Sequence, residues 1–160
     1  MRKYIAIIII FIVFSSCAKN SVFSEYKSIP NSEWHKDSIV NFTFNATDTL
    51  SKNAIYVNLR NDKNYDFNNI FLIMGVDFPN NTKIVDTLEY KMTDEKGYYL
   101  GEGFTDIKEN KLEFRINTQF PNKGKYNFYI QQAMRKNGKE SGVLLLEGIT
   151  DVGIQIEKIK

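Results

Sequence analysis

The sequence has very little of the chemistry on which most catalytic and metal sites depend. Its 160 residues include a single cysteine, Cys17, and a single histidine, His35. One cysteine excludes an internal disulfide framework and a cysteine-based zinc cluster, and one histidine makes most metal sites and catalytic triads hard to assemble. The motifs G-x-S-x-G and H-E-x-x-H and a phosphate-binding glycine loop are also missing. The sequence therefore predicts a protein that is not an enzyme and that carries no cofactor and no metal.

An excess of charge of one sign is missing too. Lys and Arg number 21 and Asp and Glu number 19, and Arg2 and Lys3 lie in the leader described below, which leaves 19 against 19. A nucleic-acid-binding protein needs clustered cations to displace counterions from phosphates, so that class is excluded. With 42% hydrophobic, 14% aromatic and 25% charged residues, the chain has the composition of one globular domain with a core.

The long apolar run lies at the N-terminus. Arg2 and Lys3 are followed by eleven apolar residues over 4–14, then by two serines and Cys17. Eleven helical residues reach about half of a ~30 Å hydrocarbon core, so the run predicts a secretory signal peptide and no transmembrane helix. Small residues directly before a cysteine are typical of bacterial lipoprotein signals, in which that cysteine carries the acyl chains. We expect a signal peptide over residues 1–16, lipidation at Cys17 and a flexible tether over residues 17–30. A secreted protein with a free thiol is the alternative.

From Trp34 onward the apolar residues recur with a period of two, which is typical of half-buried strands. Val, Ile, Phe, Tyr and Thr dominate these segments, and no stretch of eleven residues has the spacing of an amphipathic helix. Strands are expected over residues 38–44, 54–60, 70–78, 83–92, 97–103, 111–116, 125–134 and 152–159. Eight short strands separated by turns predict an all-β fold with a single β-sandwich over residues 31–160. A jelly roll is the first architecture and an immunoglobulin-like sandwich is the alternative.

A calcium loop is one candidate site. Asp62, Asn64 and Asp66 have the spacing with which such a loop opens. Phe67 stands where the loop needs glycine, and Ile73 stands where it needs a bidentate glutamate. The pattern therefore favours an ordinary polar turn.

Aromatic side chains are the second candidate. Because an aromatic ring packs on the face of a sugar ring, Trp34, Tyr98 and Tyr99 are candidate glycan-binding residues. An exposed patch of such rings would mark a binding surface. The alternative for Trp34 is a buried anchor at the first strand, with His35 as a solvated neighbour.

Five further segments occur together in this chain. They are residues 65–72 (YDFNNIFL), 86–89 (DTLE), 94–103 (DEKGYYLGEG), 132–135 (QAMR) and 148–153 (GITDVG). With the lipoprotein signal, they resemble the gliding motility lipoprotein family GldH of Bacteroidetes, over essentially the whole chain. Tyr99 departs from the family, in which many members have tryptophan there. The resemblance implies a non-catalytic envelope lipoprotein required for gliding, which acts as a subunit or assembly factor of the gliding and type IX secretion apparatus and contacts its protein components. A glycan-binding lipoprotein of the envelope is the alternative function.

Two features bear on where such a lipoprotein would lie and how it would be modified. Lipoproteins on the outer surface of Bacteroidetes cells are similar in having acidic residues just after the cysteine, and this chain has Ala-Lys-Asn there. We therefore expect an outer-membrane anchor with the domain facing the periplasm. Ser38, Thr49 and Thr87 each follow an aspartate and precede an aliphatic residue, which resembles the periplasmic O-glycosylation sequon of Bacteroidetes. The alternative is that these residues simply lead a strand out of a turn.

Overall fold

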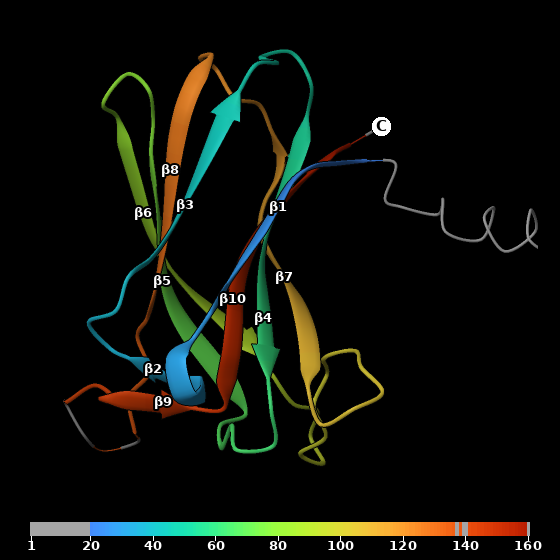
Figure 1. Ribbon diagram of the computed structural model, residues 1–160, viewed down its shortest axis with the longest axis vertical. Coiled ribbons are helices and arrows are strands. Elements are labelled where there is room, and N and C mark those ends of the chain that lie inside the picture. Colours follow the sequence, from blue (N-terminus) through green and yellow to red (C-terminus); the bar gives the residue numbers. More distant parts are fainter. Residues whose placement is uncertain (1–19, 137, 139–140, 160) are drawn as a thin grey trace, which may run out of the picture.

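Strands make up most of the described chain (Figure 1). The computed structural model describes residues 20–136, 138 and 141–159. Its strands are β1 (Ser21–Ser28), β2 (Glu33–His35), β3 (Val40–Ala46), β4 (Asn53–Asn61), β5 (Asn69–Asp77), β6 (Lys83–Lys91), β7 (Lys108–Thr118), β8 (Gly124–Gln132), β9 (Leu145–Glu147) and β10 (Ile149–Lys158), and Pro30–Ser32 forms the 3-10 helix η2. Within these residues, no helix is long and apolar enough to cross a membrane. The expected signal peptide over residues 1–16 and Cys17 lie outside the described residues.

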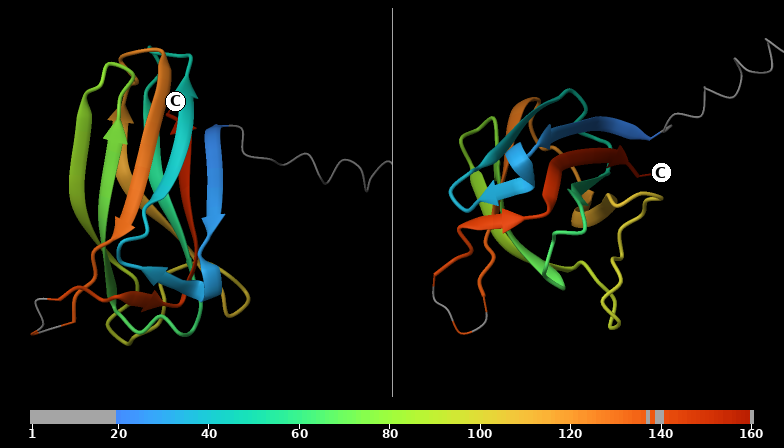
Figure 2. Two further views of the ribbon diagram at one scale, coloured as in Figure 1. Left: turned by 60° about the vertical axis from the view of Figure 1, so that its left-hand side comes forward. Right: turned by 60° about the horizontal axis from the view of Figure 1, so that its bottom comes forward.

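The long strands form two antiparallel sheets of four strands that pack as a sandwich (Figure 2). One sheet has the order β1-β10-β4-β7 and the other has the order β3-β8-β5-β6. The first long strand pairs with the last, the second with the second last, and so on inward. This nested pairing is the strand order of a jelly roll, whereas in an immunoglobulin-like sandwich the first strand pairs with the second. The prediction of an all-β, jelly-roll-like sandwich is confirmed.

One predicted strand is wrong, and another element takes its place. Residues 97–103 lie in the loop between β6 and β7, where Gly97 has a φ of +85° and Gly103 a φ of +153°. The eighth long strand is β1, which pairs with β10 and lies within the stretch predicted to be a tether. The sandwich therefore begins at residue 21 and not at residue 31, because the polar sequence of β1 is held by hydrogen bonds to β10 and buries little apolar surface of its own.

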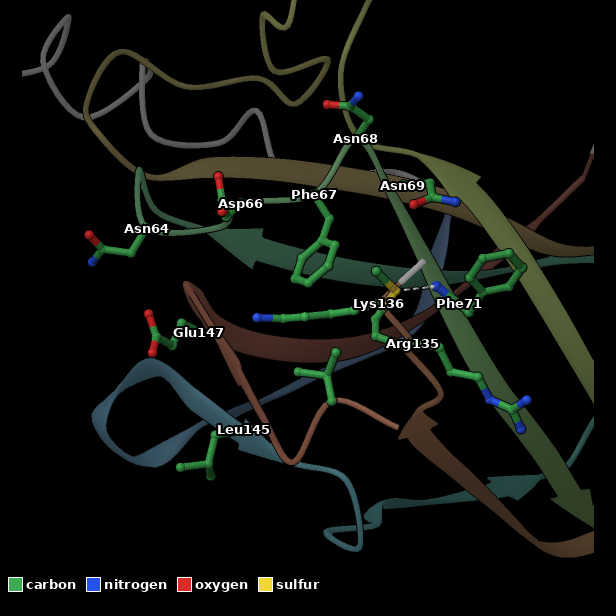
Figure 3. Close-up of a pocket in the computed structure, with 12 residues that line it drawn as sticks. Asn64, Asp66, Phe67, Asn68, Asn69, Phe71, Arg135, Lys136, Leu145 and Glu147 are labelled. Carbon is green, nitrogen blue, oxygen red and sulfur yellow. Dashed lines mark hydrogen bonds between the residues drawn. The ribbon is translucent and has the colours of Figure 1, made fainter. Parts of the chain in front are cut away.

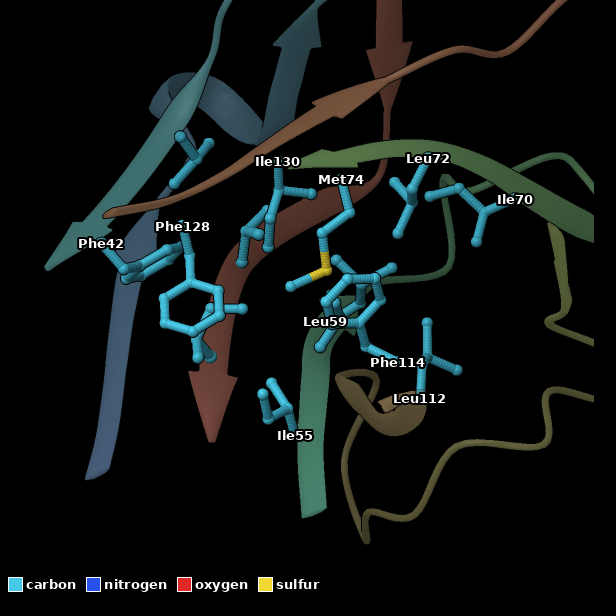
Figure 4. Packing of buried hydrophobic residues seen from close by; sticks show 14 of the residues in the cluster. Phe42, Ile55, Leu59, Ile70, Leu72, Met74, Leu112, Phe114, Phe128 and Ile130 are labelled. Atoms are coloured by element: carbon cyan, nitrogen blue, oxygen red, sulfur yellow. The ribbon is translucent and has the colours of Figure 1, made fainter. Parts of the chain in front are cut away.

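The core lies between the two sheets (Figure 4). Strand alternation turns one side chain in two inward, and Phe42 of β3, Leu59 of β4 and Phe128 of β8 are almost completely buried. The short β2–β9 sheet closes one end of the core with Trp34 and Leu146, both of which are 0% exposed. Full burial of such side chains stabilises a fold by about 1.5–3 kcal/mol each.

The two ends of the sandwich carry different parts of the chain (Figures 1 and 2). The terminal end holds residue 20, the end of β10 and the loops over residues 47–52, 78–82 and 119–123, and there the Lys158 N–H donates to the Asn20 oxygen at 2.9 Å. The distal end holds the β2–β9 sheet, the loops over residues 62–68 and 92–107, and residues 133–136 and 141–144. The first described residue and the distal loops therefore lie at opposite ends of the molecule.

Candidate binding groove at the distal end

A groove of about 580 Å³ opens at the distal end (Figure 3). Its lining comes from two stretches of the chain: the β4–β5 loop with the start of β5, and the β8–β9 connection with β9. The lining residues are Asn64, Asp66, Phe67, Asn68, Asn69, Phe71, Met134, Arg135, Lys136, Val143, Leu145 and Glu147. The groove is therefore lined by polar and apolar side chains together, and it carries charges of both signs.

A buried glutamine shapes the apolar part of the groove. The Gln132 amide donates to the Val143 oxygen at 2.7 Å and accepts the Met134 N–H at 2.9 Å, so the chain is turned out of the sheet at the end of β8. This places the Met134 sulfur where a strand carbonyl would lie, and the Phe71 N–H donates to that sulfur at 3.1 Å (Figure 3). A thioether is a weak acceptor on a flexible side chain, so this part of the groove can adapt its shape.

The opposite wall is the β4–β5 loop, which is held by its neighbours. The Asp62 carboxylate accepts the Asn64 N–H at 2.8 Å, which turns the loop sharply after β4. Tyr65 is buried behind it, and its hydroxyl donates to the Asn69 oxygen at 2.7 Å. Burial raises the pKa of Tyr65 well above its usual range, so the hydroxyl stays protonated and keeps donating.

Two further segments fix the position of Tyr65. The Tyr99 hydroxyl donates to the Tyr65 oxygen at 2.6 Å. Gly148 has a φ of +83°, and a Cβ added there would lie 2.2 Å from the Tyr65 nitrogen. Glycine is therefore required where the chain leaves β9, because no side chain fits between it and the loop.

The segments that carry the family resemblance meet around this groove. Residues 65–72 and 132–135 contribute to its lining, and residues 94–103 and 148–153 hold the loop through Tyr99 and Gly148. Within residues 86–89, Glu89 accepts a hydrogen bond from the lining residue Asn69 at 2.6 Å. The sequence contained these family-like segments as separate motifs, but it did not indicate that Arg135, Lys136 and Glu147 line one groove.

The expected aromatic platform does not form. Trp34 is 0% exposed, and its indole N–H donates to the Ser38 oxygen at 3.0 Å, so it is the buried anchor and offers no ring face to a sugar. Tyr98 is 70% exposed in the β6–β7 loop, while Tyr99 is half-buried against Tyr65. The glycan-binding role of Trp34 is therefore wrong, because the ring it would offer fills the end of the core.

The remaining candidate positions are scattered. Ser38 and Thr87 are exposed and Thr49 is half-buried, so their O-glycosylation stays a prediction. Among the described residues, no three acidic, histidine or cysteine side chains are grouped so that they could hold a metal ion. The Asp62 carboxylate of the candidate calcium loop is directed to the backbone of its own turn.

A second polar cluster lies on the outer face of the β1-β10-β4-β7 sheet. The Tyr26 hydroxyl donates to Glu109 at 2.8 Å and accepts from the Asn58 amide at 2.9 Å, while the Arg60 Nε donates to Glu109 at 2.8 Å. Burial and the Glu109 carboxylate raise the pKa of Tyr26 to about 12. The cluster joins β1 to β4 and β7 across the intervening strand β10, which indicates a structural role.

Comparison with known proteins gives one family and a distant structural likeness. A family model described as GldH lipoprotein matches residues 21–156. A gliding motility lipoprotein GldH homolog of Christiangramia forsetii is 51% identical over 147 residues, which cover 92% of this chain and 90% of that protein. The gliding motility lipoprotein GldH of Flavobacterium johnsoniae is 50% identical over 147 residues, which cover 92% of this chain and 91% of that protein. A solved structure of infectious bursal disease virus, Gx strain, is 10% identical over 87% of this chain with a TM-score of 0.40, and this chain spans 33% of its length.

Proposed function

Because the chain belongs to the GldH lipoprotein family, we propose that it is a non-catalytic subunit or assembly factor of the gliding and type IX secretion apparatus. The observation that carries the proposal is the 50% identity, over 92% of this chain, to a protein named as a gliding motility lipoprotein. As a family member, the protein is a lipid-anchored component of the cell envelope.

The anchor would hold the domain close to the membrane in one orientation. Three residues lie between Cys17 and Ser21, and the four Cα-to-Cα steps of an extended chain from one to the other span at most about 14 Å. The eight residues of β1 then run away from this point toward the distal end, over roughly 27 Å. A lipid on Cys17 would therefore keep the terminal end next to the bilayer and direct the groove away from it, toward other proteins.

The groove supports binding better than catalysis. None of its described lining residues is a serine, threonine, cysteine or histidine, so the usual nucleophiles and the usual general base are missing from its surface. A groove that combines apolar side chains with polar and charged groups is suited to recognition of a polypeptide. We place the domain on the periplasmic face of the outer membrane, because acidic residues do not follow Cys17.

The test is a deletion of the gene in the bacterium that carries it. We expect colonies that fail to spread and that secrete less type IX cargo, with both defects corrected by the wild-type gene. A strain with Cys17→Ala should release the protein into the soluble periplasm and glide poorly, while mild crosslinking of the wild type should recover components of the apparatus. Normal spreading and secretion in the deletion strain would overturn the proposal.

A further inference from the structure

β9 forms a ladder on one edge and leaves its other edge open. Glu33–His35 and Leu145–Glu147 pair residue by residue, and no other described strand pairs with β9. An open strand edge presents backbone N–H and C=O groups in the spacing that another strand requires.

The open edge belongs to two residues of the groove. Lys36 donates its N–H to the Leu144 oxygen at 2.9 Å, and Gly148 donates its N–H to the Ser32 oxygen at 2.8 Å. Backbone groups alternate in direction along a strand, so those of Leu145 and Glu147 point away from β2. Both residues line the groove, and no hydrogen bond to their backbone groups is made by any described residue.

Two carboxylates lie side by side at this edge, and the cations that line the groove, Arg135 and Lys136, form no ion pair with either of them among the described residues. Glu33 and Glu147 are direct cross-strand neighbours, a like-charge pair that destabilises the ribbon. Neither carboxylate takes part in an ion pair among the described residues, and the exposed Asp66 lies across the groove from Glu147 (Figure 3). A cation supplied from outside would relieve the repulsion.

We propose that the groove binds an extended segment of a partner protein, which adds to β9 as a third strand. The segment places a lysine or arginine beside Glu147 and an apolar side chain beside Leu145, two residues apart on the same face. Leu145 is 42% exposed, so it offers apolar surface to that side chain. This inference rests on the proposed function, because it names the partner chemistry of the same groove.

The chain's own N-terminal segment cannot be the occupant. The residues between Cys17 and Ser21 reach about 14 Å from the terminal end, whereas the groove lies beyond the full length of β1. The segment must therefore come from another polypeptide.

The long sheet edges are less suited to a new strand. Four of the nine residues of β6 and five of the eleven residues of β7 are charged, and charged side chains along an edge are a common protection against strand addition. The Tyr90 hydroxyl also donates to the Glu113 oxygen at 2.7 Å, and Arg115 pairs with Asp86, so side chains already join these two strands. Among the described residues, no side-chain hydrogen bond or ion pair ties Leu145 or Glu147 of β9 to another strand in this way.

The experiment measures peptide binding to the full-length lipidated protein in detergent micelles. The probe is a capped, dye-labelled peptide that repeats Lys-Thr-Val-Thr, so that lysine and valine lie two residues apart on one face, and its binding is followed by fluorescence anisotropy. Three comparison peptides carry glutamate for lysine, or N-methyl groups on alternate residues in each of the two frames. We expect the glutamate peptide not to bind. We expect one N-methylated frame to bind at least about tenfold more weakly and the other frame to bind normally, because a strand pairs through one edge.

Protein variants test the same edge from the other side. Leu145→Pro removes an N–H that β2 does not use, and it should weaken peptide binding at least about fivefold while circular dichroism stays unchanged. Glu147→Gln should weaken binding about threefold to fivefold at low salt, and less at high salt. The matched control Glu113→Gln, an exposed carboxylate on β7, should have no effect.

Equal binding of both N-methylated frames, or full binding by Leu145→Pro, would overturn strand addition at β9. Failure of the lysine–valine peptide to bind would overturn it as well. These results would leave the proposed function intact, since that is decided by spreading and secretion in the deletion strain. Normal gliding in that strain would overturn the proposed function without changing the peptide measurements.

Discussion

Gly148→Ala is the change that tests most directly how the groove is held. The substitution adds one methyl group at a position where the backbone has a φ of +83° and where the new Cβ would lie 2.2 Å from the Tyr65 nitrogen and 2.6 Å from its Cα. Both contacts are with backbone, so no side-chain rotation relieves them. The β4–β5 loop must move away from the end of β9.

The loss of unfolding free energy in Gly148→Ala has two parts, and a matched control variant separates them. A positive φ destabilises the folded state by about 1–2 kcal/mol when the residue is not glycine. Alanine also restricts the unfolded chain, which offsets about 0.4–1 kcal/mol of this cost. Gly97 has a φ of +85° with nothing within 4 Å of its added Cβ, so Gly97→Ala should cost about 1 kcal/mol. Gly148→Ala adds the displacement of the loop, with strained packing and a weakened hydrogen bond from Asp62 to the Gly148 oxygen. Its total cost should be about 3–4 kcal/mol.

Urea unfolding measures both variants with the same probe. Trp34 is the single tryptophan and is fully buried, so its fluorescence reports the loss of the core. With a slope of about 2 kcal/mol per molar urea, the midpoint should fall by about 0.5 M for Gly97→Ala and by about 1.5–2 M for Gly148→Ala. Equal midpoints for the two variants would refute the close approach of Gly148 to the loop.

Three further outcomes are expected. Folding raises the pKa of Tyr26 from 10.0 to about 12, so the protonated hydroxyl stabilises the folded state fully below pH 10 and loses this effect as the pH rises to 12. The urea midpoint should therefore fall between pH 10 and pH 12, and it should fall less steeply in Tyr26→Phe. Trp34→Ala should cost about 3–5 kcal/mol by circular dichroism in urea, since it leaves a cavity at the end of the core, and a loss below about 1 kcal/mol would contradict the burial. The native mature protein should be heavier than its lipidated sequence by at least one glycan, and alanine at Ser38, Thr49 and Thr87 should remove the excess; an unshifted native mass would exclude the modification.

Strands with strict alternation could be predicted from the sequence. In β3, buried and exposed side chains alternate at every position, and the predicted strand overlaps it closely. Residues 97–103 show a similar mixture of aromatic and aliphatic residues, but Gly97 and Gly103 turn the chain there with positive φ values. β1 could not be predicted, because its two aromatic residues, Phe23 and Tyr26, are three positions apart and so lie on opposite faces.

The groove depends on relations that one sequence does not contain. Glu33 and Glu147 become neighbours through the register of β2 against β9, and this register depends on how the whole jelly roll closes. Gly148 and Tyr65 meet for the same reason. The family-like segments indicated which residues belong together, whereas their arrangement around an open strand edge required the structure.

The pairing of β1 with β10 also determines how the domain would carry a mechanical load. β1 begins at the terminal end and runs toward the distal end, and it pairs with β10 in one register from Phe23 opposite Ile156 to Ser28 opposite Asp151. A pull between a lipid on Cys17 and a partner in the groove would act along the axis of β1. The hydrogen bonds of its ladder would then be sheared together, instead of opening one after another as they do when strands are peeled apart. Under such a pull, the sandwich would transmit tension to the membrane without unfolding from its first strand.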